Sequence, residues 1–353
     1  MQKQWKKRIR MFGMEKGRHQ GMQENREEHS LGNKKEIDLE EICRGAKKIG
    51  ISGHIRPDGD CVGSCMALSR YLKKVAEGAE VSVFLEPPAD IFRCLQGVEE
   101  IRSEASEETF DVFFALDCSA DRLGFAQGLF EKAAKRVNID HHITNGNGCG
   151  QENYVVPSAS STSELVYKLM QKELVDTEIA KAVYLGIVHD TGVFQYSNTS
   201  PETMRIGAEL IAYGFDFSRL IEDTFYEKTY VQNQILGRAL LESVLFLNGR
   251  CIVSVVEKKT MEFYGVGPKD LDGIVSQLRT TKGVDCAIFL YQTGVLEYKV
   301  SMRSNEKINV AEIAGYFGGG GHARAAGCTM NGTYYDVINN LSLHIEKQIE
   351  NEE

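Results

Sequence analysis

The chain has 353 residues, 42% of them hydrophobic, which is enough for two domains with separate cores. Its formal net charge is −9, yet residues 1–18 carry seven Lys or Arg and one Glu, so the rest of the chain is more acidic still. An acidic body argues against wrapping a long nucleic acid, and no apolar run approaches the ~18 residues of a membrane span.

The N-terminal segment, residues 1–35, is basic and has no clear apolar face, so we expect a disordered tail. It lacks the roughly 7–15-residue apolar stretch of a signal peptide. The nine cysteines are irregularly spaced, which suits reduced thiols. A cytoplasmic location is therefore expected.

Short apolar runs bounded by polar residues or glycine predict buried strands at 49–52, 81–85, 112–116 and 137–139. Helical patterns alternate with these strands, at 38–48, 62–77, 161–171, 176–188 and 201–214. The helix at 161–171 opens with a capping box, Ser161 to Glu164. This alternation indicates an α/β domain with a parallel sheet, which we expect over residues 36–225.

The composition changes near residue 215, and we expect a linker at 226–240 and a second domain at 241–350. Two hairpins, turning at Asn248-Gly249 and near Thr293-Gly294, are predicted there. Together with flanking helical patterns they indicate a smaller, mixed α/β domain. The active site is expected in the cleft between the two domains.

Histidine and aspartate residues follow several of these strands or end a helix, and we expect them to form a two-metal site. The candidate ligands are His54, Asp58, Asp60, Asp117, His141 and Asp190. In open α/β sheets ligands bind at the carboxyl ends of the strands, so these side chains should converge. Each segment alone has an ordinary explanation as a turn or a cap, and only the combination predicts chemistry.

A two-metal site needs cations about 3.5–4 Å apart with a carboxylate between them, and Asp117 is the expected bridge and catalytic residue. Four carboxylates balance two divalent ions, and two imidazoles favour two Mn²⁺, with Co²⁺ or Fe²⁺ as alternatives, over Mg²⁺. His142 is the candidate catalytic donor to the phosphoryl or leaving oxygen, although a core histidine is the alternative. Asp140 is expected to orient a ligand histidine from the second shell of the site.

The segments GHIRPDGD, ALDCS, IDHH and HDTGVF resemble the motifs of the DHH phosphoesterase family, named for a tripeptide present at Asp140–His142. KVSMRSN at 299–305 and IAGYFGGGGHARAAG at 313–327 resemble the substrate domain associated with that family. The resemblance covers nearly all of 36–350. It implies a parallel α/β domain with a dinuclear manganese centre, and it is strongest to the branch that degrades very short RNA (nanoRNases) and dephosphorylates pAp. Arg56 stands where many relatives carry Asn, which bears on substrate preference.

The second motif suits phosphate or nucleotide capture, although a glycine run alone is usually a turn. Glycines let backbone amides approach an anion, and arginine and histidine side chains add donors. The candidate substrate-binding residues are Arg303, Gly319, Gly320, Gly321 and His322.

The sequence therefore predicts a manganese-dependent phosphoesterase in which a metal-bridging hydroxide attacks phosphorus. The resemblance implies hydrolysis of short oligoribonucleotides to 5′-mononucleotides, removal of the 3′ phosphate of pAp, or both. A cyclic-di-AMP or pApA phosphodiesterase would use the same site, whereas a pyrophosphatase or a processive exonuclease fits less well. A non-catalytic nucleotide-binding regulator is the alternative of a different class. The expected partner is a small nucleotide or short RNA, without long nucleic acid or membrane, and a homodimer is compatible with the sequence.

Overall fold

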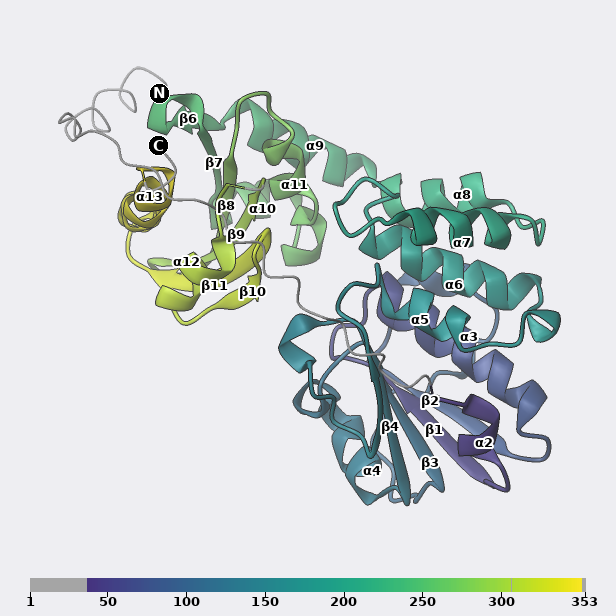
Figure 1. Ribbon diagram of the computed structural model, residues 1–353. Coiled ribbons are helices and arrows are strands. Elements are labelled where there is room, and N and C mark those ends of the chain that lie inside the picture. Colours follow the sequence, from purple (N-terminus) through teal and green to yellow (C-terminus); the bar gives the residue numbers. More distant parts are fainter. Residues whose placement is uncertain (1–36, 306, 351–353) are drawn as a thin grey trace, which may run out of the picture. The chain divides into compact units, whose positions relative to one another are not determined.

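The structure is a computed structural model that describes residues 37–305 and 307–350. The described residues form two units, one ending at Glu227 and the other beginning at Lys228 (Figure 1). The tail expected at 1–35 lies outside the described residues. Among the helices that the structure describes, none is long and apolar enough to cross a bilayer.

The first unit is built on a five-stranded sheet in which every neighbouring pair is parallel, in the order β2-β1-β3-β4-β5. Its strands are β1 (Lys48–Ser52), β2 (Glu80–Phe84), β3 (Val112–Leu116), β4 (Lys135–Asp140) and β5 (Glu152–Val155). The chain leaves β1 toward β2 on one side and returns to β3 on the other, so the topological switch point lies between β1 and β3. Ligand crevices form at the carboxyl ends of the strands at such a point.

Helices cover both faces of this sheet (Figure 1). They are α2 (Leu39–Cys43), α3 (Gly59–Val75), α4 (Gln127–Lys132), α5 (Thr162–Lys168), α6 (Thr177–Asp190), α7 (Pro201–Ile211) and α8 (Phe217–Ile221). Phe114 of β3 belongs to the core formed with α3, α5 and α6. Its neighbour Phe113 points to the other face and packs on Phe130 of α4. Burial on both faces explains why β3 is an unbroken apolar run, and the expected α/β fold is confirmed.

The second unit contains a six-stranded mixed sheet in the order β10-β11-β9-β8-β7-β6, in which only β7 and β8 pair in parallel. Its strands are β6 (Val244–Phe246), β7 (Cys251–Val256), β8 (Cys286–Gly294), β9 (Glu297–Ser304), β10 (Gly320–His322) and β11 (Ala325–Asn331). Its α-helices are α9 (Tyr230–Leu241), α10 (Lys258–Tyr264), α11 (Ile274–Arg279), α12 (Val310–Tyr316) and α13 (Tyr334–Glu350). One core lies between the sheet and α12 and α13, and another between the sheet and α9 and α11.

Two details of the second unit differ from expectation. The expected linker at 226–240 contains most of α9, which buries Ile235 and Ala239 against the sheet. Glu227 and Lys228 precede the helix and Arg238 is exposed on it, so the composition of the segment resembles that of a linker. The second hairpin turns at Val295 and Leu296, after Gly294, because β8 continues through that glycine.

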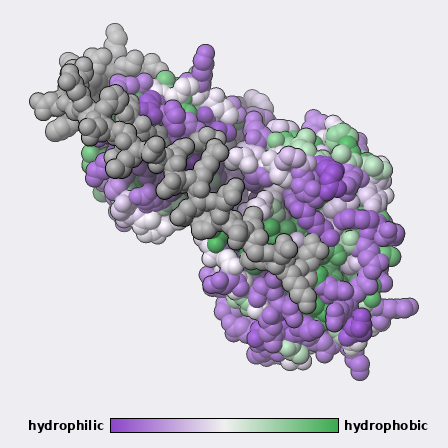
Figure 2. All heavy atoms as spheres, viewed as in Figure 1, coloured by the Kyte–Doolittle hydropathy of each residue, from purple (hydrophilic) through white to green (hydrophobic). Residues whose placement is uncertain are grey.

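Hydrophilic residues cover most of the visible surface of both units (Figure 2).

Candidate metal centre

The loop after β1 supplies the first candidate ligands. His54 is 6% exposed, and its Nδ1 donates to the carbonyl oxygen of Ile55 at 2.9 Å. This bond fixes the ring and leaves Nε2 as the nitrogen that faces the cluster. His54 Nε2 lies 3.5 Å from Asp58 Oδ1 and 3.4 Å from Asp117 Oδ2. These three side chains form one group able to hold a cation.

Asp58 also begins helix α3. Its Oδ1 accepts the backbone N–H groups of Asp60 and Cys61, both at 3.1 Å, so it is the N-cap residue. Asp60 follows on the first turn and is buried. Gly59 lies against the ring of His189, which a β-carbon at this position would overlap. The cap and the glycine together fix where the two carboxylates leave the helix.

Asp117 follows β3 and lies beside both groups of candidate ligands. Its backbone φ is 60°, a left-handed conformation that Asp tolerates better than most residues. Its N–H donates to the carbonyl oxygen of Ile139 at 3.0 Å, which ties it to β4. Oδ2 faces His54, whereas Oδ1 lies 3.5 Å from Nε2 of His141. A bridging carboxylate requires this arrangement, with one oxygen toward each group.

The second group combines Asp60, His141 and Asp190, whose ligand atoms all lie within 4.8 Å of one another. His141 Nε2 is 3.2 Å from Oδ2 of Asp190, the last residue of α6. Asp60 Oδ2 accepts the N–H of Thr162 at 2.7 Å, and Oδ1 accepts that of Ser163 at 2.9 Å. The structure therefore brings all six candidate ligands together in two neighbouring groups.

Asp140 and His142 are bonded to each other beside these groups, and His142 also belongs to a third group of possible ligands, with Asp117 and His141. Asp140 is completely buried, and its Oδ1 accepts the backbone N–H of His142 at 3.0 Å and lies 2.7 Å from Nδ1 of that ring. Its Oδ2 accepts from Nδ2 of Asn145 at 2.7 Å. His142 Nδ1 is also 3.5 Å from Asp117 Oδ1. Asp140 thus holds the ring of His142, a histidine of this cluster, as is expected of a residue beside the ligands.

Burial and the close spacing of charged groups shift the pKa values of several residues in the cluster. Burial opposes the charged form of His54, but the hydrogen bonds to Asp117 and Asp58 and the nearby negative charges together outweigh it and raise the pKa of His54 to about 12. In His141 burial is likewise outweighed by the bond to Asp117 together with the charges of Asp190 and Asp60, and the pKa rises to about 10. Burial and the charge of Asp117 raise the pKa of Asp60 to about 7. Without a metal, protons on these groups balance the charge of the carboxylates. Divalent cations could supply that positive charge instead, so the set of donor atoms fits such ions.

Residues 160–164, predicted from the sequence only as the start of a helix, include two direct partners of this cluster, Thr162 and Ser163. Thr162 Oγ1 donates to Asp117 Oδ1 at 3.0 Å. Ser161 caps α5 as expected, because its hydroxyl accepts the N–H of Glu164. The carboxylate of Glu164 does not complete the expected capping box and accepts from Ser160 and Thr203 instead. The available signal is the run of five polar residues, all of which are buried. Buried polar groups need partners, so such a run points to a polar site beneath it.

In the second unit, one row of the sheet joins two of the candidate substrate-binding residues. His322 of β10 is opposite Ala325 of β11, which is opposite Arg303 of β9. Directly opposite residues point to the same face of a sheet, so His322 and Arg303 share one face. Arg303 Nη1 also donates to the carbonyl oxygen of Met302 at 3.0 Å.

The glycines beside this row have different steric surroundings. A β-carbon on Gly319 would overlap the carbonyl oxygen of Gly327, and one on Gly321 would overlap that of Ala325. A β-carbon on Gly320 would meet nothing within 4 Å. Gly319 and Gly321 are therefore needed for the close approach to β11, and the backbone at Gly320 is accessible.

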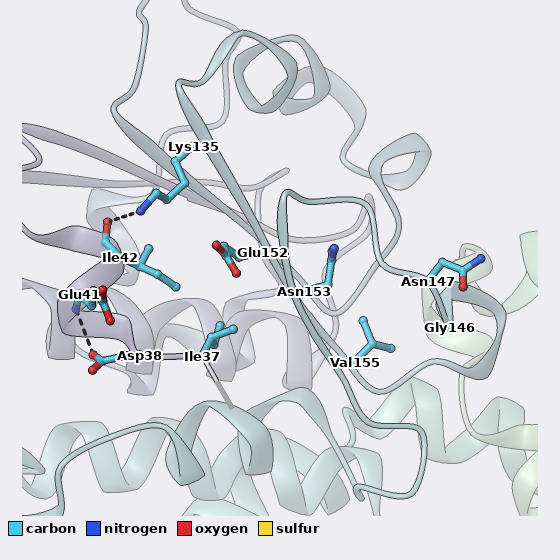
Figure 3. Close-up of a pocket in the computed structure, with 10 residues that line it drawn as sticks. All are labelled: Ile37, Asp38, Glu41, Ile42, Lys135, Gly146, Asn147, Glu152, Asn153 and Val155. Atoms are coloured by element: carbon cyan, nitrogen blue, oxygen red, sulfur yellow. Dashed lines mark hydrogen bonds between the residues drawn. The ribbon is translucent and has the colours of Figure 1, made fainter. Parts of the chain in front are cut away.

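A pocket of about 570 Å³ lies beside α2 and the edge strand β5 (Figure 3). It is lined by Ile37, Asp38, Glu41, Ile42, Lys135, Gly146, Asn147, Glu152, Asn153 and Val155. Lys135 and Glu152 are the first residues of their strands, so the pocket reaches the amino-terminal edge of the sheet. None of the six candidate ligands lines it, and it is not part of the metal centre.

Comparison with known proteins gives matches over both units. Residues 48–187 match the DHH family N-terminal domain, and residues 248–351 match the DHHA1 domain. The bifunctional oligoribonuclease and PAP phosphatase NrnA of Thermus thermophilus is 34% identical over 294 residues, which cover 82% of this chain and 86% of that protein. The NrnA of Bacillus subtilis is 27% identical over 284 residues, 78% of this chain and 87% of the relative. An exopolyphosphatase-related protein from Bacteroides fragilis has a similar structure, with a TM-score of 0.81, 25% identity and coverage of 89% of this chain and 96% of that one.

The fold, the cluster at the switch point and these matches together define a phosphoesterase, a hydrolase of phosphate ester bonds. The chain belongs to the DHH family and carries the DHHA1 domain at its C-terminal end. The resemblance found in the sequence motifs is thus confirmed.

Proposed function

We propose that the protein is a manganese-dependent phosphoesterase that hydrolyses short oligoribonucleotides to 5′-mononucleotides and removes the 3′ phosphate of pAp. The observation that carries the proposal is the carboxylate of Asp117, with Oδ2 toward His54 and Oδ1 toward His141. This geometry suits a pair of cations better than a single one.

The proposed ligands are His54 and Asp58 for one ion, Asp60, His141 and Asp190 for the other, and Asp117 for both. Two bound divalent cations would supply a hydroxide near neutral pH and positive charge for the phosphoryl oxygens. The two imidazoles support Mn²⁺ over Mg²⁺, which prefers oxygen ligands.

His142 is the proposed acid. Its Nδ1 is held by the buried carboxylate of Asp140, which sets the direction of the ring. A proton on Nε2 would then pass to the oxygen that leaves phosphorus. In the short RNA and in pAp alike, this is a ribose 3′ oxygen. Asp140 acts through His142 and is a positioning residue.

The substrate assignment is supported by the relatives named bifunctional oligoribonuclease and PAP phosphatase, of whose length the matches cover 86–87%. In the second unit, Arg303 can grip a phosphate through two donors, and His322 adds a further one on the same face. The accessible backbone at Gly320 suits a nearby anion.

A substrate panel tests this function. Purified protein with Mn²⁺ is given pAp, pApA, cyclic-di-AMP, a five-nucleotide RNA and a long single-stranded DNA. We expect phosphate from pAp, mononucleotides from the short RNA, and little product from the long DNA. Turnover of cyclic-di-AMP or pApA in clear preference to the other substrates would replace the substrate assignment, and no turnover of any substrate would overturn the catalytic one.

A further inference from the structure

Thr162 connects two of the proposed ligands, although neither its sequence motif nor the family match assigns it a role. Its side-chain Oγ1 donates to Asp117 Oδ1 at 3.0 Å. Its backbone N–H donates to Asp60 Oδ2 at 2.7 Å. Asp60 comes from the start of α3 and Asp117 from the end of β3. A single residue therefore touches carboxylates from two different elements of the site.

Thr162 is itself held firmly. It is completely buried, and it follows Ser161, whose Oγ accepts the N–H of Glu164 at 3.0 Å. The carboxylate of Glu164 is buried and accepts from Ser160 at 2.6 Å and from Thr203 at 2.7 Å. A donor fixed in this way can orient the group to which it is bonded.

We propose that Thr162 is a positioning residue that sets metal affinity by fixing the orientation of the Asp117 carboxylate. The terminal torsion of an Asp side chain is broad, so the carboxylate is not held by its own rotamer preference. The hydroxyl of Thr162 holds Oδ1 on the side of His141, and Oδ2 consequently stays on the side of His54. Without that bond the carboxylate can turn away from one of the two groups.

A hydroxyl is well suited to this role. It donates one hydrogen bond to Oδ1 and leaves another lone pair of that oxygen for a cation. A lysine or arginine at this position would bring a positive charge into the site and compete with the metal. Removal of partners that orient metal ligands typically costs 10–100-fold in affinity.

The test measures Mn²⁺ binding directly, by calorimetry and by the electron paramagnetic resonance signal of free Mn²⁺. Thr162→Val keeps the branched shape but removes the hydroxyl, whereas Thr162→Ser keeps the hydroxyl. We expect Mn²⁺ affinity about 10–100-fold weaker in Thr162→Val and within about threefold of wild type in Thr162→Ser. Ser254→Ala is the control, because the Ser254 hydroxyl is also buried but donates to the carbonyl oxygen of Ala239 in the second unit, and its loss should leave Mn²⁺ affinity unchanged.

The proposal is overturned if folded Thr162→Val binds Mn²⁺ as tightly as wild type, or if Thr162→Ser is as weak as Thr162→Val. If Thr162→Val does not fold, Thr162→Ala takes its place, since it lacks the hydroxyl and adds no methyl group beside Asp117. The inference rests on the metal site of the proposed function, and the two fail differently. A wild-type protein that binds no Mn²⁺ contradicts the proposed function, whereas equal binding by wild type and Thr162→Val contradicts only the role of Thr162.

Discussion

The carboxylate of Asp117 faces both groups of proposed ligands, whereas the ligand of a single ion would need to face only one. Its carboxylate lies beside three histidines and accepts from Thr162, while its backbone is tied to β4. Burial opposes its ionisation, but the bonds to His141 and His54 hold its pKa below the usual range. The residue is therefore an anion in the folded protein, as a bridging ligand must be.

The variant Asp117→Ala should lose metal loading and turnover together. Since Asp117 is proposed to bind both ions, we expect a fall in activity well beyond the roughly 10–100-fold typical of an indirect partner. Metal content after gel filtration and the rate of phosphate release from pAp measure the two effects. A variant with normal activity would refute the bridging assignment.

His142→Gln should separate catalysis from metal binding. Loss of a positioned acid lowers kcat by about 10²–10⁴-fold, and Mn²⁺ affinity should change little because His142 is not a proposed ligand. Asp140→Asn should act in the same direction but more weakly, since it disturbs only the orientation of His142. An equal loss of Mn²⁺ in His142→Gln would instead make this histidine a metal ligand.

At the scale of elements, the contact between α5 and α6 determines where Asp60 lies. A β-carbon on Gly186 of α6 would overlap Ser163 Oγ and lie 2.7 Å from Asp60 Oδ1. Only glycine lets α6 approach the start of α5 this closely. The packing of these helices is therefore part of the metal site.

Gly186→Ala should lower the free energy of unfolding by about 1–3 kcal/mol, the usual cost of overpacking, and weaken Mn²⁺ binding. Gly128→Ala in α4 is the control, because its β-carbon would meet nothing within 4 Å and alanine favours helix. Urea denaturation and Mn²⁺ titration of both variants provide the measurement. Equal free energies of unfolding for the two variants would contradict this prediction, because they would show that α6 can shift away from Ser163 without loss of stability.

In the second unit, the row that joins His322 and Arg303 predicts an effect on substrate binding. Arg303→Ala should raise KM for pAp or the short RNA by about tenfold or more and change kcat less, because the side chain is proposed to bind phosphate away from the reacting atoms. Arg205→Ala on the exposed surface of α7 controls for the lost charge. A change in kcat alone would place Arg303 in the chemistry instead.

The elements that the sequence predicted best are those with one-sided or complete burial. β1, β3 and β4 are apolar runs because helices cover both faces of the sheet. β5 was not predicted, since this edge strand is only half buried and Glu152–Val155 forms no apolar run. The six residues of α4 were too few to show a helical period.

At the scale of the whole molecule, six candidate ligands spread over 137 residues converge because parallel strands end at one edge of the sheet. Sheet topology made this convergence predictable. The partner of Asp140 and the contacts of Thr162 were not predictable, because they depend on how a loop turns and how α5 packs.

The charge of the site also predicts how metal binding depends on pH. The raised pKa values of His54 and His141 mean that both rings retain protons near neutral pH in the metal-free protein, where they stabilise the fold. That stability is complete below their unfolded pKa of about 6.5 and is lost as the pH rises through the folded values. A metal needs the neutral ring, so Mn²⁺ binding should release protons and become tighter as the pH rises from about 6 to 9.

Calorimetric titrations in two buffers with different ionisation enthalpies count the released protons. Affinity that does not change with pH, together with no proton release, would show that neither histidine is a ligand.

The most direct test of the account is a titration of exhaustively chelated protein with Mn²⁺, in which bound metal and pAp hydrolysis are followed together. Two cations should bind per chain, and activity should be absent at the start and complete only when both are bound. Full activity in protein shown to contain no metal, or a single binding equivalent at full activity, would contradict the two-metal centre.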